Sequence, residues 1–240
     1  LLGTAWAYST RIPLPPPALK HINRTQHTLE ESARYMPLVG LFVGAIAGSV
    51  FLGANELFGS KALAIILSIA ASIIVTGAFQ ENGLINFFNR FAGTFGSGAL
   101  MVAILIKSQA LLLIPGHLIP SALIAAHAFS QFAAGSFIFT HGYVGQHDDG
   151  HLKPTMNERM PTRDFIVMAF LGMAPLLLVG SLLFLLLVPI MWIVRNLFGA
   201  WFIRKIDGYT RDCLGAVQQV VEICCYLLIT IGLTYALGAG

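Results

Sequence analysis

Long apolar stretches joined by short polar links dominate the chain and predict an all-α protein. Seven of them approach the roughly 20 residues that a helix needs to cross a bilayer. They lie near residues 36–55, 62–79, 99–115, 118–140, 165–186, 188–203 and 217–238. The fifth and sixth are divided only at Pro189. No repeat of fixed period is visible, so we expect one membrane-embedded domain over residues 1–240, a polytopic helical bundle of about seven transmembrane helices.

Composition supports lipid as the solvent for much of the surface. Hydrophobic residues make up 56% of the 240 positions and charged residues only 10%, whereas a soluble domain carries about 25% charged residues. The formal net charge of +3 is small, and we expect no nucleic-acid partner. Cys213, Cys224 and Cys225 show no ligand spacing and are interpreted as packing residues. The chain opens with Leu1 rather than Met, so we expect a trimmed N-terminus.

The basic residues predict the orientation. With seven spans, eleven of the 14 Lys and Arg fall on one side of the membrane and Lys61 alone falls on the other. The eleven are Arg11, Lys20, Arg24, Arg34, Arg90, Lys153, Arg159, Arg163, Arg204, Lys205 and Arg211. By the positive-inside rule that side is cytoplasmic. We therefore expect the working face of the protein there.

The first candidate site follows the second apolar stretch. Asn82, Asn86 and Asn89 are spaced i, i+4, i+7, which stacks them on one face of a helix beside Glu81. Such oxygen groups indicate either a hard-cation or polyphosphate site, or simply a polar helix end at the membrane interface.

Two further segments carry candidate chemistry. The loop from Asp207 to Ala216 is followed by Glu222 inside the last apolar stretch; a glycine-containing loop at a helix start can bind phosphate, or can be only a capped turn. Residues 141–164 include Lys153 and are long enough for a lid, although most of them are interpreted as a solvated connector. The cluster His147, Asp148, Asp149 and His151 is interpreted as a hydrated turn.

Lys107 lies within the third apolar stretch, where a charged side chain is costly enough to indicate a functional site.

Read in order, these motifs resemble the cobalamin synthase (adenosylcobinamide-GDP ribazoletransferase) family almost from end to end. The matching segments are Ser9–Pro15, Tyr35–Gly40, Gly77–Phe79, Gly93–Gly96, Lys107, Ala126–Ser130, Lys153–Pro154, Gly208–Thr210, Asp212, Leu214–Ala216 and Glu222.

The resemblance implies a bacterial or archaeal inner-membrane enzyme. It would join α-ribazole, or its 5′-phosphate, to adenosylcobinamide-GDP and release GMP, with Mg²⁺ as cofactor. Membrane lipid would be a partner, and a homo-oligomer is possible.

The resemblance also implies residue roles. Metal-binding positions would be Glu81, Asn82, Asn86 and Asn89. Catalytic positions would be Glu81, Asp212 and Lys153. Arg11, Lys107, Thr210 and Glu222 would bind or orient the ligands.

Three departures from the family are visible. Its His and three Asp stand here as Gln80, Asn82, Asn86 and Asn89. Amide oxygens carry no charge, so the affinity for Mg²⁺ should fall, and a protein with this sequence should have little enzymatic activity. Between Ala92 and Thr94 the family has an additional polar stretch that is missing here. In the last loop, two family glycines are Asp207 and Arg211, and the family's Arg after Ser130 is Gln131.

Two alternatives stay open at this point. One is a CDP-alcohol phosphotransferase, although its Asp-Gly-x-x-Ala-Arg pattern is absent because Gly83 is followed by Leu84, Ile85 and Asn86. The other is a small-molecule transporter, which would place its polar groups near the midplane and often contains inverted repeats.

Overall fold

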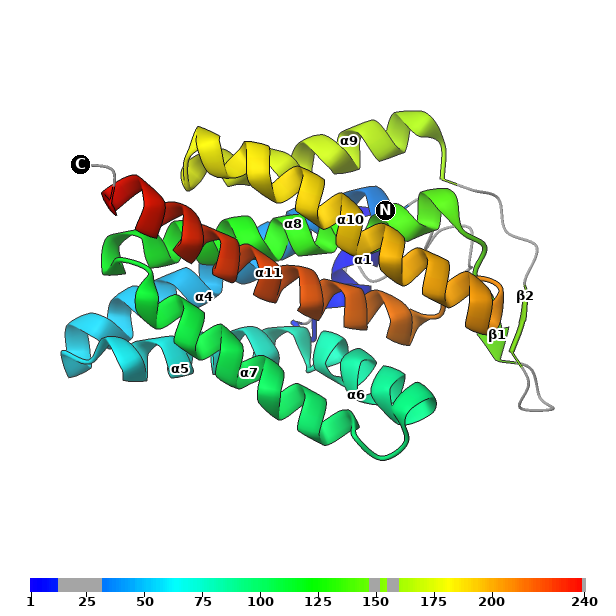
Figure 1. The fold of residues 1–240 in the computed structure, drawn as a ribbon, viewed down its shortest axis with the longest axis horizontal. Coiled ribbons are helices and arrows are strands. Elements are labelled where there is room, and N and C mark those ends of the chain that lie inside the picture. Colours follow the sequence, from blue (N-terminus) through cyan, green and yellow to red (C-terminus); the bar gives the residue numbers. More distant parts are fainter. Residues whose placement is uncertain (13–31, 147–151, 155–159, 239–240) are drawn as a thin grey trace.

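The computed structural model describes residues 1–12, 32–146, 152–154 and 160–238 and confirms an all-α membrane bundle (Figure 1). The helices are α1 (Leu2–Ser9), α4 (Met36–Phe58), α5 (Lys61–Thr76), α6 (Phe79–Ala92), α7 (Gly96–Leu113), α8 (Ile119–Thr140), α9 (Thr162–Met173), α10 (Ser181–Ile206) and α11 (Arg211–Gly238). Short 3-10 turns are η1 (Ala33–Tyr35), η2 (Gly116–Leu118) and η3 (Ala174–Leu178). Strands β1 (Val144–Gln146) and β2 (Leu152–Pro154) form an antiparallel hairpin in which Gly145 pairs with Lys153.

Fewer helices can span a membrane than the sequence predicts. Among the described residues, five are long and apolar enough, and the bent pair α5–α6 raises the number to six at most. The predicted stretch 165–186 fails because α9 has only 12 residues and gives way to η3, which contains Pro175, before Gly180 at φ 132°. Pro189, the expected break, instead lies inside α10.

The predicted stretch 62–79 also ends earlier than expected, at a sharp bend. Helix α5 stops at Thr76, and Gly77 and Ala78 both adopt left-handed conformations, with φ of 66° and 59°. A non-glycine residue costs about 1–2 kcal/mol there. Helix α6 leaves this bend at 85° to α5 and packs against α11.

Helix α8 is the centre of the bundle, with 89% of its spanning window buried. Helices α4, α9 and α11 pack around it. Glycines on α4 allow close contact with α8, since a Cβ at Gly44 would lie 2.6 Å from Ile124 Cα and one at Gly40 would lie 2.4 Å from the His127 carbonyl oxygen. The α4–α8 contact therefore depends on the absence of side chains.

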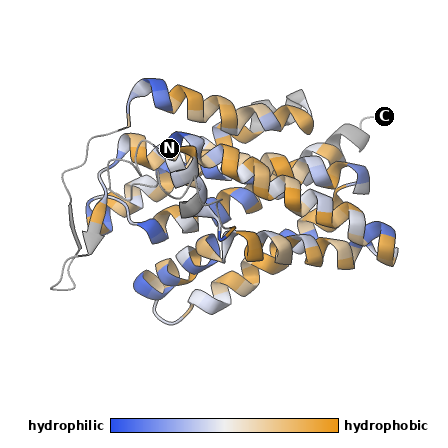
Figure 2. Ribbon diagram, turned by 180° about the vertical axis from the view of Figure 1, so that it is seen from behind, coloured by the Kyte–Doolittle hydropathy of each residue, from blue (hydrophilic) through white to orange (hydrophobic). Residues whose placement is uncertain are grey.

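The polar ends of several elements gather at one end of the bundle. Helix α6, the β1–β2 hairpin, the end of α10 and the start of α11 lie together there (Figure 1), and hydrophilic residues concentrate at helix ends while helix middles are hydrophobic (Figure 2). Lys61 lies at the opposite end, where its Nζ donates to the Leu112 and Ile114 carbonyl oxygens at 2.7 and 2.6 Å. The arrangement agrees with the charge asymmetry of the sequence.

Replacing Gly44 with alanine should destabilise the bundle, because the new Cβ overlaps the α8 backbone and the two helices must separate. We expect a loss of about 1–3 kcal/mol, measured as a lower thermal midpoint of the detergent-solubilised protein. Gly53→Ala, on the same helix with nothing within 4 Å of its Cβ, is the control and should not lower the midpoint. Equal midpoints for the two variants would contradict this packing.

Candidate functional site

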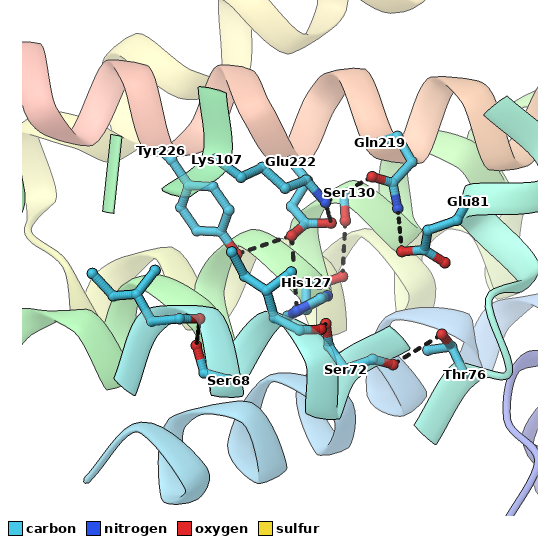
Figure 3. Close-up of polar contacts among 12 residues, drawn as sticks. Ser68, Ser72, Thr76, Glu81, Lys107, His127, Ser130, Gln219, Glu222 and Tyr226 are labelled. Atoms are coloured by element: carbon cyan, nitrogen blue, oxygen red, sulfur yellow. Dashed lines mark hydrogen bonds and ion pairs between the residues drawn. The ribbon is translucent and has the colours of Figure 1, made fainter. Parts of the chain in front are cut away.

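Six buried residues from four helices form a polar cluster inside the bundle, which we call the polar centre (Figure 3). They come from α6, α7, α8 and α11. The members are Glu81, Lys107, His127, Gln219, Glu222 and Tyr226.

An ion pair and two hydrogen bonds connect α6, α7 and α11 within the polar centre. Lys107 Nζ lies 2.8 Å from Glu222 Oε2 and donates to Gln219 Oε1 at 2.7 Å. The amide nitrogen of Gln219 donates to Glu81 Oε1 at 2.9 Å. Tyr226 donates its hydroxyl to Glu222 Oε1 at 3.0 Å, and His127 Nε2 lies 3.8 Å from the same oxygen.

The local sequence explains why these groups meet. On α11, Gln219, Glu222 and Tyr226 are spaced i, i+3, i+7, so a helix places them along one stripe. Glu81 lies in the first turn of α6, where a carboxylate is favoured by the helix dipole. Lys107 reaches the same place from α7 because that helix packs on α11.

A small polar cavity adjoins the polar centre. Ser72 and Thr76 of α5, together with Gln80 and Gln218, line this cavity beside Glu81, His127, Gln219 and Glu222. The Oε2 atom of Glu81 is buried and accepts no hydrogen bond. The cavity has no room for a nucleotide or a ribazole.

The outer face of α6 carries the amides in a separate group. Asn82, Asn86 and Asn89 are exposed. The Asn86 amide nitrogen donates to Asp212 Oδ1 at 3.2 Å, and Asn89 Oδ1 accepts from the Gly96 amide at 2.9 Å. Helices α6 and α11 meet closely here, since a Cβ at Gly83 would lie 2.9 Å from Gly215 Cα.

These outer residues do not by themselves fit a magnesium ion. The predicted ligand Glu81 is turned inward to Gln219, and within the described ranges no group of three or more His, Cys, Asp or Glu could hold a metal. Asn86 presents its N–H group, not its oxygen, to Asp212. Because Asp212 is the one carboxylate that contacts these amides in the described part of the chain, the charge that Mg²⁺ requires is lacking.

The remaining predicted residues lie around the same end of the molecule. Arg11 is exposed and packs over the α5–α6 bend, where a Cβ on Gly77 would meet its side chain at 2.3 Å. Thr210 caps α11, since its Oγ1 accepts from the Cys213 amide at 3.4 Å. Lys153 belongs to β2, and the hairpin joins the loop before α11 through a hydrogen bond from the Val144 amide to the Tyr209 carbonyl oxygen at 2.8 Å. The cluster at residues 147–151 lies outside the described residues.

Sequence reasoning missed several members of the site. Gln219 and Tyr226 were not predicted, although their spacing from Glu222 along one helix face is a signal that could have found them. Ser72 and Thr76 give no such signal, because small hydroxyl residues are common in membrane helices. Their role depends on the bend that turns Glu81 toward α5.

Comparisons with known proteins now decide the family. The family model described as cobalamin-5-phosphate synthase matches residues 1–92 and 89–230. The chain belongs to this family.

Curated relatives agree with this assignment to the cobalamin-5-phosphate synthase family. A protein of Ralstonia pickettii named adenosylcobinamide-GDP ribazoletransferase is 36% identical, covering 92% of this chain and 91% of its own. Proteins of the same name from Shewanella frigidimarina and Shewanella pealeana are 34% and 36% identical, covering 95% and 96% of this chain and 93% and 95% of theirs. No solved structure matches with significance.

The matches also bear on the expected gap beside Gly93. The two segments of the family match meet at residues 89–92, and here α6 and α7 are joined by only three residues, Gly93 to Phe95. That a polar stretch of the family is missing at this connection stays a prediction.

Replacing Lys107 with methionine should strongly destabilise this cobalamin-5-phosphate synthase homologue. The change leaves Glu222 buried without its cation, and breaking a buried pair in this way costs about 3–5 kcal/mol. Thermal unfolding in detergent would measure the loss, with the exposed Lys205→Met as the matched control. Adding Glu222→Gln to the Lys107→Met variant should restore part of the stability; no recovery would show that the charge of Glu222 is not the cause.

Proposed function

We propose that this protein is an adenosylcobinamide-GDP ribazoletransferase, which joins α-ribazole or its 5′-phosphate to adenosylcobinamide-GDP and releases GMP. The observation that carries the proposal is the similarity to relatives of that name, at 34–36% identity over more than nine tenths of both chains. The reaction belongs to the last stage of cobalamin synthesis.

The polar end of the bundle supports this chemistry. A hydroxyl oxygen of the ribazole attacks a phosphorus of the diphosphate, the new P–O bond forms, and the bond to the departing GMP breaks. Among the basic residues at this end, we assign Arg11 and Lys153 to offset phosphate charge. Asp212, half-buried at the start of α11, is the carboxylate that we assign to accept the hydroxyl proton.

The amides on α6 determine how fast this reaction runs. With Asn at residues 82, 86 and 89, the outer face contributes no negative charge of its own, and Mg²⁺ should bind weakly. We propose that the protein retains substrate binding while its magnesium-dependent turnover is low. In keeping with the basic residues at this end, we place the site at the cytoplasmic face of the inner membrane.

The magnesium proposal predicts a gain of activity. GMP release from adenosylcobinamide-GDP and α-ribazole by the purified protein should be slow and should need high Mg²⁺ concentrations. The triple change Asn82→Asp, Asn86→Asp and Asn89→Asp should raise the rate at low Mg²⁺ by about tenfold or more, where tenfold corresponds to about 1.4 kcal/mol. Fast turnover of the unchanged protein at low Mg²⁺ would contradict the proposal that Mg²⁺ binding is weakened. Absence of GMP release by both proteins would contradict the proposed reaction.

Asp212 gives a second test in the background of the triple variant. Asp212→Asn should lower GMP release by about a hundredfold, because removing a general base forfeits roughly 10²–10⁴ in rate. Glu56→Gln, an exposed carboxylate on α4, should leave the rate unchanged. Equal rates for both variants would remove Asp212 from the reaction.

A further inference from the structure

The charges of the polar centre do not balance. Two carboxylates, Glu81 and Glu222, share one lysine, Lys107, which lies against Glu222 at 2.8 Å. Glu222 also accepts from the Tyr226 hydroxyl through its other oxygen, Oε1, at 3.0 Å. No cation of the described residues lies within ion-pair distance of Glu81, and its Oε2 is buried without a hydrogen-bond partner. When both carboxylates are ionised, one negative charge therefore has no ion-pair partner in this part of the bundle.

The cavity beside Glu81 is lined by oxygen atoms suited to a cation. The Ser72 hydroxyl donates its hydrogen to the Ile69 carbonyl at 2.8 Å, and the Thr76 hydroxyl donates to the Ser72 carbonyl at 2.9 Å. Since their hydrogens are used by backbone, both hydroxyls retain lone pairs that can accept or ligate. Gln80 and Gln218 add amide groups to the same cavity.

We propose that this cavity binds one monovalent alkali cation, Na⁺ or K⁺, with Glu81 as its principal ligand. A single positive charge neutralises the single uncompensated carboxylate, whereas a divalent ion would leave an excess. The small volume of the cavity excludes an organic ligand, and oxygen donors are the ligands that hard cations select. The ion would fix the first turn of α6, and so the position of the amide face, from within.

Thermal unfolding of the full chain in detergent tests this site directly. The midpoint should rise and saturate as NaCl or KCl replaces N-methyl-D-glucamine chloride at constant ionic strength, because an ion bound only by the folded protein stabilises it. Comparing the two salts identifies the ion. Equal midpoints in all three salts would overturn the site, and so would a midpoint that depends on pH but not on the alkali ion, since Glu81 would then carry a proton.

Variants locate the effect within the cavity. Glu81→Gln should abolish the salt response, and Glu56→Gln should retain it. Thr76→Val should weaken the apparent ion affinity about tenfold, equivalent to one lost ligand, while Thr76→Ser retains the hydroxyl and the response. If Glu81→Gln does not fold, the two variants at Thr76 still test the site. Equal salt dependence of the thermal midpoint in Thr76→Val and Thr76→Ser would contradict it. None of these measurements requires turnover, so their outcome is separate from that of the proposed reaction.

Discussion

The buried ion pair between Lys107 and Glu222 is the interaction on which the rest of the structure depends. It joins α7 to α11 at 2.8 Å between two buried side chains, where an unpaired charge is costly. Through Gln219 the same lysine reaches Glu81 and the beginning of α6. The polar end of the molecule is therefore positioned from inside the bundle.

The two faces of α6 divide the functional groups. Its inner face gives Glu81 to the polar centre, and its outer face presents the amides near Asp212. The close passage of Gly83 over Gly215 keeps α6 and α11 in contact between these groups. As a result, the interior charge and the exterior site are neighbours along the helix but contact different residues of α11.

Hydropathy was sufficient to predict the helical bundle, because the need to satisfy backbone groups in lipid leaves few alternatives. Hydropathy did not predict the helix ends at Gly180 and at the Gly77–Ala78 bend. These ends are set by backbone dihedral angles, which the hydropathy of an apolar sequence does not report. The stacking of Asn82 and Asn86 on one exposed face followed from helical spacing. The inward turn of Glu81, one residue away, did not, because it depends on a partner on α11, 138 positions away in sequence.

The Asn86–Asp212 contact has an evolutionary consequence. Asparagine and aspartate are nearly identical in shape, and their codons differ in one base. Because the Asn86 amide donates to Asp212, an acid at residue 86 would place two carboxylates side by side and replace this hydrogen bond with repulsion. A single base change here therefore alters the electrostatics of the contact between α6 and α11 as well as the charge of the outer face.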